Sequence, residues 1–239
     1  MVFDKQARSL APRIVLPVPS SAGKGVLISP TIYGNVMLGP TAEGLDDRTA
    51  TGTSEAGIVV LRTKGQALMP ALMREEVTAT YAGLRAAIDR PDYLIEADPQ
   101  QRYLLVGGIR STGLTAGMAI AEHVRDLLIA AGLDLTPRPQ LPPPPRMPML
   151  GEAFWRPYQD AELIARDPAY GHIVCFCERV TAGEIRDALA ATIPAVTIGG
   201  LRRRTRALNG RCQGFFCGAE VERLLAEGIR DAGAQEARR

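Results

Sequence analysis

The chain has 239 residues, of which 46% are hydrophobic and 23% charged, and its formal net charge is +2. This length is enough for one large domain or two smaller ones. Because the net charge is close to zero, it gives no reason to expect a strongly acidic or basic partner. The sequence contains no run of about 18 apolar residues, and the start MVFDKQARSL lacks the pattern of a secretory signal. We therefore expect a cytoplasmic chain without a transmembrane segment.

Composition divides the chain into three regions. Residues 1–136 mix strand-like and helix-like runs, residues 137–168 form a proline-rich linker, and residues 169–239 hold all four cysteines. The linker contains PRPQLPPPPRMPML, whose prolines favour extended polyproline II over a helix or an inner strand. We predict an α+β fold, with a mixed or antiparallel sheet and helices first and a small, mostly helical domain last.

The first elements of the chain are read from its apolar spacing. Residues 25–38 (GVLISPTIYGNVML) predict two strands that are broken at the Ser-Pro-Thr step. Residues 57–67 and 68–79 have helical spacing, and Pro70 is suited to begin the second of these helices. Residues 77–86 alternate like a strand that leads into a loop.

A strand, a glycine-rich loop and a helix follow. Residues 93–96 and 103–109 predict short strands on either side of the polar turn ADPQQR. Residues 115–131 have the best helical pattern of the chain, and Gly132 lies where a C-terminal glycine stop belongs. The start of such a helix offers free amides and partial positive charge to an anionic group, although an ordinary β–α turn has the same pattern.

The four cysteines have the spacing Cys-x-Cys, a long gap, and Cys-x-x-x-x-Cys. In an extended segment Cys175 and Cys177 point the same way and can bind one metal centre, while Phe176 faces the other side and packs. Reduced thiols in the cytoplasm disfavour two disulfides. A [2Fe–2S] cluster, a zinc ion and free thiols remain as alternatives, although zinc usually takes Cys-x-x-Cys twice. The second pair of candidate ligands is Cys212 and Cys217.

Three helices are predicted around these cysteines. Thr181 and Glu184 form a capping-box pattern, which begins the first helix. The second helix is expected over residues 199–206 and the third from Ala219. The loop between them, residues 208–218 (LNGRCQGFFCG), presents the second cysteine pair, and its glycines allow the backbone to come close to a cluster.

Five arginines crowd the same region, and three interpretations are open. They form a solvated helix face, a nucleic-acid patch, or a set of charges that offsets a thiolate-ligated cluster. No aromatic residues interleave with them and no known reader motif accompanies them, so we expect no nucleic-acid partner. These residues are Arg202, Arg203, Arg204, Arg206 and Arg211.

Two parts of the sequence resemble known families. VCFCERVTAGEIRDAL (174–189) and LRRRTRALNGRCQGFFC (201–217) resemble the BFD-like [2Fe–2S] domain. KGVLISPTIYGNVMLGPTAEGLDDR (24–48), TYAGLRAAID (80–89) and LLVGGIRSTGLTAGMAIAEHV (104–124) resemble the C-terminal half of FAD-dependent oxidoreductases of the D-amino-acid-oxidase superfamily. The nearest types are GlpA-like glycerol-3-phosphate dehydrogenase and L-2-hydroxyglutarate oxidase. The resemblance implies a substrate domain followed by a [2Fe–2S] domain.

The resemblance also implies a function and its site residues. Substrate, either glycerol 3-phosphate or a small hydroxy or amino acid, reduces FAD, and electrons pass to the [2Fe–2S] cluster and on to an acceptor protein or a quinone-linked subunit. Arg85 matches the arginine that anchors the small anionic substrate, with Arg110 as a neighbouring candidate and Tyr33 lining the pocket. The loop that lies against the flavin ring comprises Gly108, Ile109, Arg110, Ser111, Thr112, Gly113 and Leu114.

The sequence departs from the family at one point. It contains no Gly-x-Gly-x-x-Gly turn, which cradles the FAD pyrophosphate in family members. We therefore expect FAD to bind only together with a chain or segment that carries this half, and a partner to bring the chain to the inner membrane as a peripheral subunit. The alternatives are a zinc-stabilised interaction module and a non-catalytic iron–sulfur electron-transfer or assembly subunit.

Overall fold

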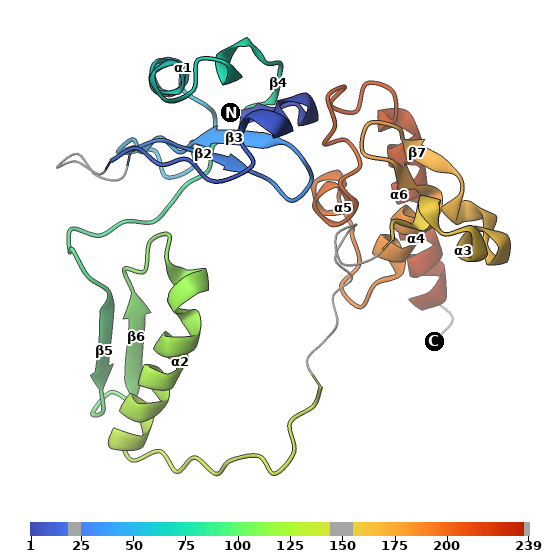
Figure 1. Cartoon of the computed structure of the whole chain (residues 1–239). Helices are drawn as coiled ribbons and strands as arrows, with labels where there is room; N and C mark the ends of the chain where they lie inside the picture. Colours follow the sequence, from blue (N-terminus) through green and yellow to red (C-terminus); the bar gives the residue numbers. More distant parts are fainter. Residues whose placement is uncertain (19–24, 144–154, 237–239) are drawn as a thin grey trace. The chain divides into compact units, whose positions relative to one another are not determined.

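The structure, a computed structural model, describes residues 1–18, 25–143 and 155–236. It divides into two compact units, which are described separately (Figure 1). Unit 1 holds the described residues of 1–44, 53–81 and 147–239, and unit 2 holds those of 45–52 and 82–146. Among the described residues, no helix is both long enough and apolar enough to cross a membrane.

The first part of unit 1, residues 1–44 and 53–81, is the sheet module. Its four strands pair antiparallel in the order β2–β3–β1–β4. The predicted pair of strands is confirmed, because β2 and β3 flank a turn at residues 31–35 and pair Ile28 with Leu38. The strands are β1 (Val2–Phe3), β2 (Leu27–Pro30), β3 (Val36–Gly39) and β4 (Val77–Ala79).

Helices cover this sheet, but one predicted helix is absent. Helix α1 (Glu55–Leu68) confirms the first helical pattern, and the Ser54 side chain caps it by accepting from the Gly57 N–H at 2.9 Å. The second pattern, over residues 68–79, was wrong as a helix. Only the short 3₁₀ helix η2 (Leu72–Arg74) forms there, because residues 77–79 pair with β1, and this long-range pairing overrides the local helical spacing. A further 3₁₀ helix, η1 (Lys5–Leu10), follows β1.

The core of the sheet module lies between the sheet and these helices. Phe3, Ile28, Val36, Leu38 and Leu72 are almost completely inaccessible to solvent. They come from three strands and η2, so the sheet is held by side chains that are far apart in the sequence. Burial of this apolar surface is the main favourable term in the stability of the module.

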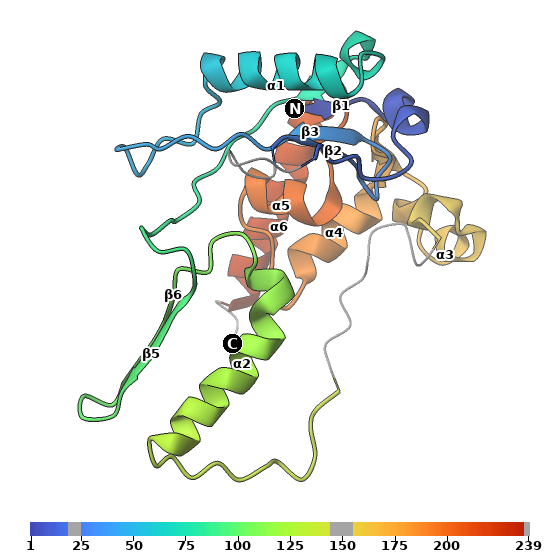
Figure 2. The ribbon, with the colours of Figure 1, turned by 60° about the vertical axis from the view of Figure 1, so that its left-hand side comes forward.

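The second part of unit 1, residues 155–236, is the cysteine module (Figure 2). It is mostly helical, as predicted, with one two-stranded antiparallel hairpin. Its core is formed by Val180, Ile185, Leu201 and Val221 among others. The hairpin is β7 (Ile173–Cys175) and β8 (Val180–Thr181), and the main helices are α4 (Ala182–Ala190), α5 (Ile198–Thr205) and α6 (Gly218–Glu236).

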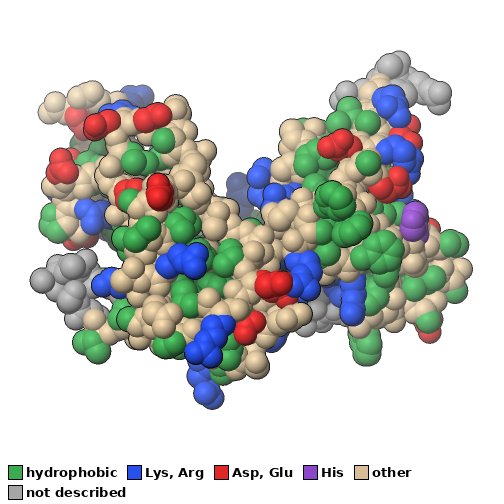
Figure 3. Space-filling model, turned by 90° about the horizontal axis from the view of Figure 1, so that it is seen from above, with side chains coloured by type: hydrophobic (Ala, Val, Ile, Leu, Met, Phe, Trp, Pro, Cys, Tyr) green, Lys and Arg blue, Asp and Glu red, His purple; other side chains and the backbone are tan. Residues whose placement is uncertain are grey.

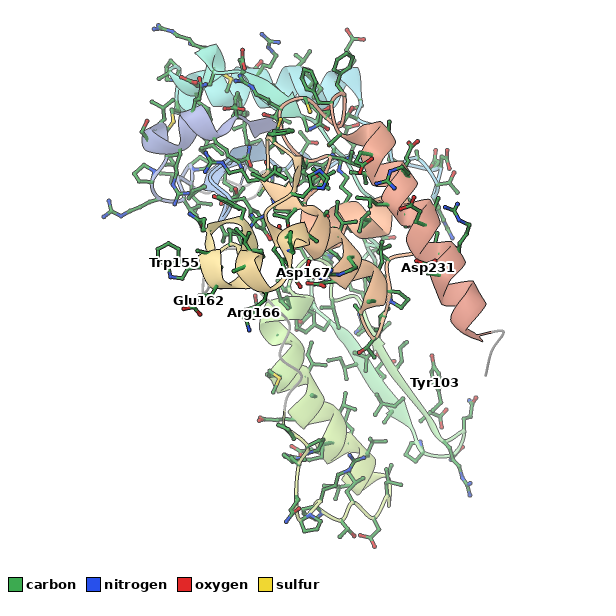
Figure 4. All side chains as sticks on the ribbon, turned by 90° about the vertical axis from the view of Figure 1, so that its right-hand side faces the viewer. Tyr103, Trp155, Glu162, Arg166, Asp167 and Asp231 are labelled. Atoms are coloured by element: carbon green, nitrogen blue, oxygen red, sulfur yellow. The ribbon has the colours of Figure 1, made fainter. Side chains whose placement is uncertain are left out.

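Three short helices precede the hairpin, and the first two lie within the range predicted as linker. They are η3 (Pro157–Gln159), α3 (Ala161–Arg166) and η4 (Pro168–Tyr170). Asp167 joins α3 to η4 and pairs with Arg186 of α4 at 2.6 Å, and Figure 4 shows it at the end of α3. The prolines of the predicted linker at 144–150 lie outside the described residues, and the domain boundaries at 136 and 168 remain predictions.

Unit 2 is called the hairpin unit. It confirms the predicted strands and helix as β5 (Leu94–Asp98), β6 (Tyr103–Gly107) and α2 (Gly113–Ala130). The strands pair antiparallel, and Gly132 ends the helix with φ +88°. No residue of this unit that the structure describes is buried. The α+β class is confirmed by both units, which combine antiparallel strands with helices.

Candidate iron–sulfur centre and flavin-side residues

The fold brings the four cysteines together from two places in the cysteine module. Cys175 ends β7 and Cys177 lies in the turn after it. Cys212 lies in the loop between α5 and α6, and Cys217 directly precedes α6. All four are free thiols, with Cys175 and Cys217 buried and Cys177 and Cys212 half-buried. The candidate site thus has a buried edge and a more accessible edge.

The thiols meet as two adjacent pairs. Among the neighbouring thiols, Cys212 contributes most to raising the pKa of Cys177, and Cys175 contributes most to raising the pKa of Cys217. Charge interactions connect the pairs, between Cys175 and Cys177 and between Cys212 and Cys217. Among the described residues, no three His, Cys, Asp or Glu side chains converge as ligands of a single metal ion. Four thiols from two loops match the ligand number of a [2Fe–2S] cluster, which zinc shares.

Backbone amides of the second loop point at the sulfurs. Backbone hydrogen bonds from Phe216, Gly214 and Phe215 hold the pKa of the Cys212 thiol below its usual value. Burial raises the pKa of Cys217 to about 11. The backbone N–H of Cys212 favours the Cys177 thiolate, but burial and the Cys212 thiol outweigh it and raise the pKa of Cys177. Hydrogen bonds of this kind stabilise metal-bound thiolate and tune the potential of a cluster.

Gly210 allows the second loop to approach the first cysteine pair. A Cβ at this position would lie 2.1 Å from the Cβ of Cys177 and 3.3 Å from its sulfur. Any larger residue would therefore push the loop away from Cys177. Two neighbouring pairs of thiols, backbone amides directed at Cys212 and this close backbone approach together fit a [2Fe–2S] cluster, and the four cysteines are the residues that would hold it.

Three phenylalanines next to the ligands are exposed. Phe176 is 75% exposed, so the prediction that it packs was wrong, because it lies in the turn between β7 and β8 and not in an extended segment. Phe215 and Phe216 are also exposed and stack edge to face at 5.1 Å. Apolar side chains reach the surface elsewhere in the chain as well (Figure 3). Exposed rings at the cysteines indicate a surface suited to contact another molecule.

The arginines near the cysteines are not merely a solvated helix face. Four of the five contact partners within unit 1 and tie the loop to its surroundings. These contacts are from Arg202 to Asn209 and Gln213, from Arg204 to the Ile193 carbonyl, from Arg206 to Glu178, and from Arg211 to Glu76. The arginines therefore also stabilise the conformation of the cysteine loop.

The predicted flavin-side loop connects β6 to α2 in the hairpin unit. Gly108 adopts φ +68° and its position is closely packed, since a Cβ there would lie 2.5 Å from Ile88. Arg110 donates to the Ile88 carbonyl at 3.0 Å and to the Arg90 carbonyl, so its guanidinium braces a neighbouring segment. Thr112 makes no side-chain cap on α2, and Leu114 in the first turn is fully exposed. The N-terminus of α2 therefore has no side-chain cap and lies beside an apolar side chain. These two features suit a flavin ring that carries negative charge at one edge.

The structure places the three predicted substrate residues in different surroundings. Arg85 is exposed in an irregular segment of the hairpin unit, which also contains Arg110. Tyr33 belongs to the turn between β2 and β3 of the sheet module, where the Arg206 guanidinium lies 3.6 Å from its ring centroid. One face of the Tyr33 ring is thus covered by the cysteine module. The roles of Arg85, Arg110 and Tyr33 in substrate binding, and of residues 108–114 in flavin binding, remain predictions.

Sequence reasoning missed Glu178 and Lys5. Glu178 follows Cys177 directly and is almost completely buried, where it binds Lys5 at 3.0 Å and Arg206 at 2.9 Å. The only signal in the sequence is a carboxylate next to a candidate ligand. Lys5 lies far from the cysteines in the sequence, and no local pattern connects the two residues.

Comparison with known families agrees with this geometry. Residues 1–127 match the family described as FAD dependent oxidoreductase. The chain belongs to this family. Residues 173–227 match the BFD-like [2Fe-2S] binding domain, and this range includes all four cysteines. The family resemblance and the cofactors FAD and [2Fe–2S] expected from the sequence are confirmed at the level of these domains.

The curated relatives are longer proteins. A glycerol 3-phosphate dehydrogenase from Caloramator mitchellensis is 34% identical over 230 residues, which cover 94% of this chain and 47% of the relative. A glycerol 3-phosphate oxidase from Mycoplasma genitalium is 33% identical over 131 residues, 54% of this chain and 34% of the relative. A subunit of the anaerobic glycerol-3-phosphate dehydrogenase of Escherichia coli is 25% identical over 225 residues, 82% of this chain and 41% of the relative. The chain therefore spans less than half the length of these relatives. The comparison with solved structures found no match.

Proposed function

We propose that this chain is part of an FAD-dependent glycerol 3-phosphate dehydrogenase that passes electrons from flavin to a [2Fe–2S] cluster. One observation carries the proposal: the relatives whose alignments extend over 94% and 82% of the chain are named dehydrogenases. The alignments with relatives named oxidases cover 131 and 121 residues, too few to include both the oxidoreductase match and the cysteine match. Among these relatives, the cysteine module therefore aligns with proteins named dehydrogenases. A dehydrogenase passes its electrons to an acceptor other than oxygen.

The chain's own residues have distinct tasks in this proposal. When bound, FAD supplies two-electron chemistry and the cluster supplies one-electron transfer. Arg85 anchors the anionic substrate, and Arg110 either shares this task or keeps the loop in place through the Ile88 and Arg90 carbonyls. The N-terminus of α2 stabilises negative charge near Leu114. Cys175, Cys177, Cys212 and Cys217 hold the cluster.

The proposal includes two kinds of partner. The first is a chain or segment that carries the Gly-x-Gly-x-x-Gly turn and binds the FAD pyrophosphate. It is needed because this chain spans less than half of its relatives. An acceptor protein or a quinone-linked subunit takes electrons from the cluster. The exposed rings of Phe176, Phe215 and Phe216 support a protein acceptor, because apolar rings beside a redox centre give a surface for transient docking. A cytoplasmic location, peripheral to the inner membrane through such a partner, belongs to the same proposal.

The test is anaerobic purification followed by assays of iron, sulfide, zinc and flavin. Iron and sulfide of about two each per chain are expected for a [2Fe–2S] cluster, with red-brown colour. Zinc of about one without sulfide would favour the zinc-stabilised interaction module instead. Glycerol 3-phosphate should then reduce a dye acceptor in the absence of oxygen, once a flavin-binding half is supplied.

The same experiment separates the enzyme from a non-catalytic subunit. The described part of the hairpin unit has no buried residue, and a flavin-binding surface without a core is poorly ordered. For the chain alone, this favours the non-catalytic subunit over the enzyme. A chain that carries iron and sulfide, yet gives no substrate-dependent dye reduction with the flavin-binding half present, would be an electron-transfer or assembly subunit.

A further inference from the structure

Charged side chains of the sheet module and the cysteine module meet beside two of the cluster ligands. Glu178, directly after Cys177, accepts from Lys5 of the sheet module at 3.0 Å. Its second carboxylate oxygen accepts from Arg206 at 2.9 Å, and only 3% of the Glu178 side chain is exposed. A buried carboxylate of this kind is stable only with its cations in place, because loss of one leaves a desolvated charge poorly compensated.

A second contact lies beside Cys212. Arg211, the residue before this ligand, pairs with Glu76 and lies 3.6 Å from Asp4, both of the sheet module. The backbone also holds these two acids together, since the Asp4 N–H donates to the Glu76 carbonyl at 2.9 Å. The carboxylate of Asp4 caps η1 by accepting from the Gln6 N–H. The acceptors for Arg211 are thus part of the sheet and its first turn rather than free side chains.

The two contacts are complementary in charge. The sheet module offers one cation and two anions, and the cysteine module offers one anion and two arginines. Asp4 and Lys5 are adjacent in sequence but carry opposite charges and meet opposite partners, so a shift of one module would bring like charges together. Tyr33 adds an aromatic face to the junction, on which the Arg206 guanidinium stacks.

The junction lies at one particular edge of the cluster site. Glu178 and Arg211 flank Cys177 and Cys212, which are the two half-buried thiols and lie close to each other. The other pair, Cys175 and Cys217, is packed into the core of the cysteine module. Any charge on the facing part of the sheet module therefore acts on the Cys177–Cys212 edge.

We propose that this junction is an electrostatic dock, in which Lys5, Asp4 and Glu76 hold the sheet module against the Cys177–Cys212 edge and Lys5 raises the reduction potential of the cluster. The proposal rests on the cluster assigned under the proposed function. One-electron reduction adds one negative charge to the cluster, which a nearby cation stabilises more than it stabilises the oxidised form. Lys5 and Glu178 are positioning residues in this scheme, because they act through the ligand segments and are not themselves ligands.

The potential of the cluster tests the role of Lys5. The full chain with its cluster is titrated by redox potentiometry, with the spectrum of the reduced cluster as the readout. Lys5→Met should lower the midpoint potential, and Lys5→Arg should leave it close to that of the parent chain. The matched control is Lys64→Met, which removes the same charge from an exposed position on α1. Equal midpoints for Lys5→Met and Lys64→Met, with iron and sulfide retained, would overturn this role.

A charge swap tests the dock without any redox measurement. Arg211→Glu and Glu76→Arg should each speed amide hydrogen exchange in residues 2–10 and 208–217, because each places like charges at the junction. The double variant should recover part of the protection, but not all, because Asp4 then faces a carboxylate at position 211 in place of the guanidinium. Strictly additive effects of the two substitutions would overturn the dock. A chain that lacks iron and sulfide but shows this recovery would contradict the proposed function and leave the dock intact.

Discussion

The cysteine module and the hairpin unit both carry sequence motifs of a known family, yet they differ in how completely they are built. The cysteine module has a core of its own and places its buried Glu178 and Glu184 against arginine side chains. The hairpin unit has no buried residue in its described part, although its strands and helix form as predicted. A two-stranded hairpin and one helix bury too little surface to be stable alone. The comparison indicates that a motif forms a well-ordered cofactor site by itself only when the same part of the chain also contains a hydrophobic core.

The largest effect is expected for a buried ligand of the cysteine module. Cys217→Ser should abolish the cluster, because a serine oxygen in this buried position is a poor substitute for the thiolate at the start of α6. Iron and sulfide content and the visible spectrum provide the measurement. Phe216→Leu, a change at the exposed neighbouring residue, is the control and should retain both. A Cys217→Ser chain with full iron and sulfide would show that this cysteine is not a ligand.

The next effect concerns the approach of the two cysteine segments. Gly210→Ala should destabilise the cysteine module by about 3 kcal/mol and reduce cluster loading, because the new methyl group would overlap Cys177. Gly218→Ala is the matched control, since a Cβ at Gly218 meets nothing within 4 Å. Thermal unfolding followed by circular dichroism compares the two variants. Equal unfolding temperatures would mean that the close approach at Gly210 is not needed.

A smaller effect is expected at the start of α4. Thr181→Ala should cost about 1–2 kcal/mol, because the Thr181 hydroxyl accepts from the Glu184 N–H at 3.2 Å in a buried capping box. Thr181→Ser keeps the hydroxyl and should recover most of the loss. Denaturant unfolding of the two variants measures the difference. A Thr181→Ser variant no more stable than Thr181→Ala would point to the lost methyl packing instead of the cap.

The smallest effect on stability is expected in the hairpin unit. Leu114→Lys should change the free energy of unfolding by less than about 0.5 kcal/mol, because Leu114 is fully exposed. With a flavin-binding half present, the same variant should retain less flavin than Leu141→Lys, a control at another exposed leucine outside the loop. Flavin absorbance after gel filtration provides the measurement. Equal flavin retention in the two variants would remove residues 108–114 from the flavin-side surface.

Several features could be predicted because they depend on neighbours in the sequence. The capping box of Thr181 and Glu184, the stop at Gly132 and the strands around the turn at 99–102 all formed where local patterns placed them. The cysteine spacing also limited the candidates to a cluster, zinc or free thiols. The proximity of the thiols across the two loops became visible only in the structure, and the match to a [2Fe–2S] binding domain is what favours a cluster over zinc.

The sequence by itself determined the family, most of the longer helices and the candidate ligands, since these depend on spacing, caps and local motifs. Residues 77–79 fall in both a helical pattern and a strand pattern, and only the tertiary structure decided for the strand. It also decided that Phe176 faces solvent and that Tyr33 lies under Arg206. It also brought Lys5 to Glu178, which lies in a different module far along the chain. The physical reason is the same in each case: these contacts depend on burial and charge between segments far apart in the chain, which a local pattern does not encode.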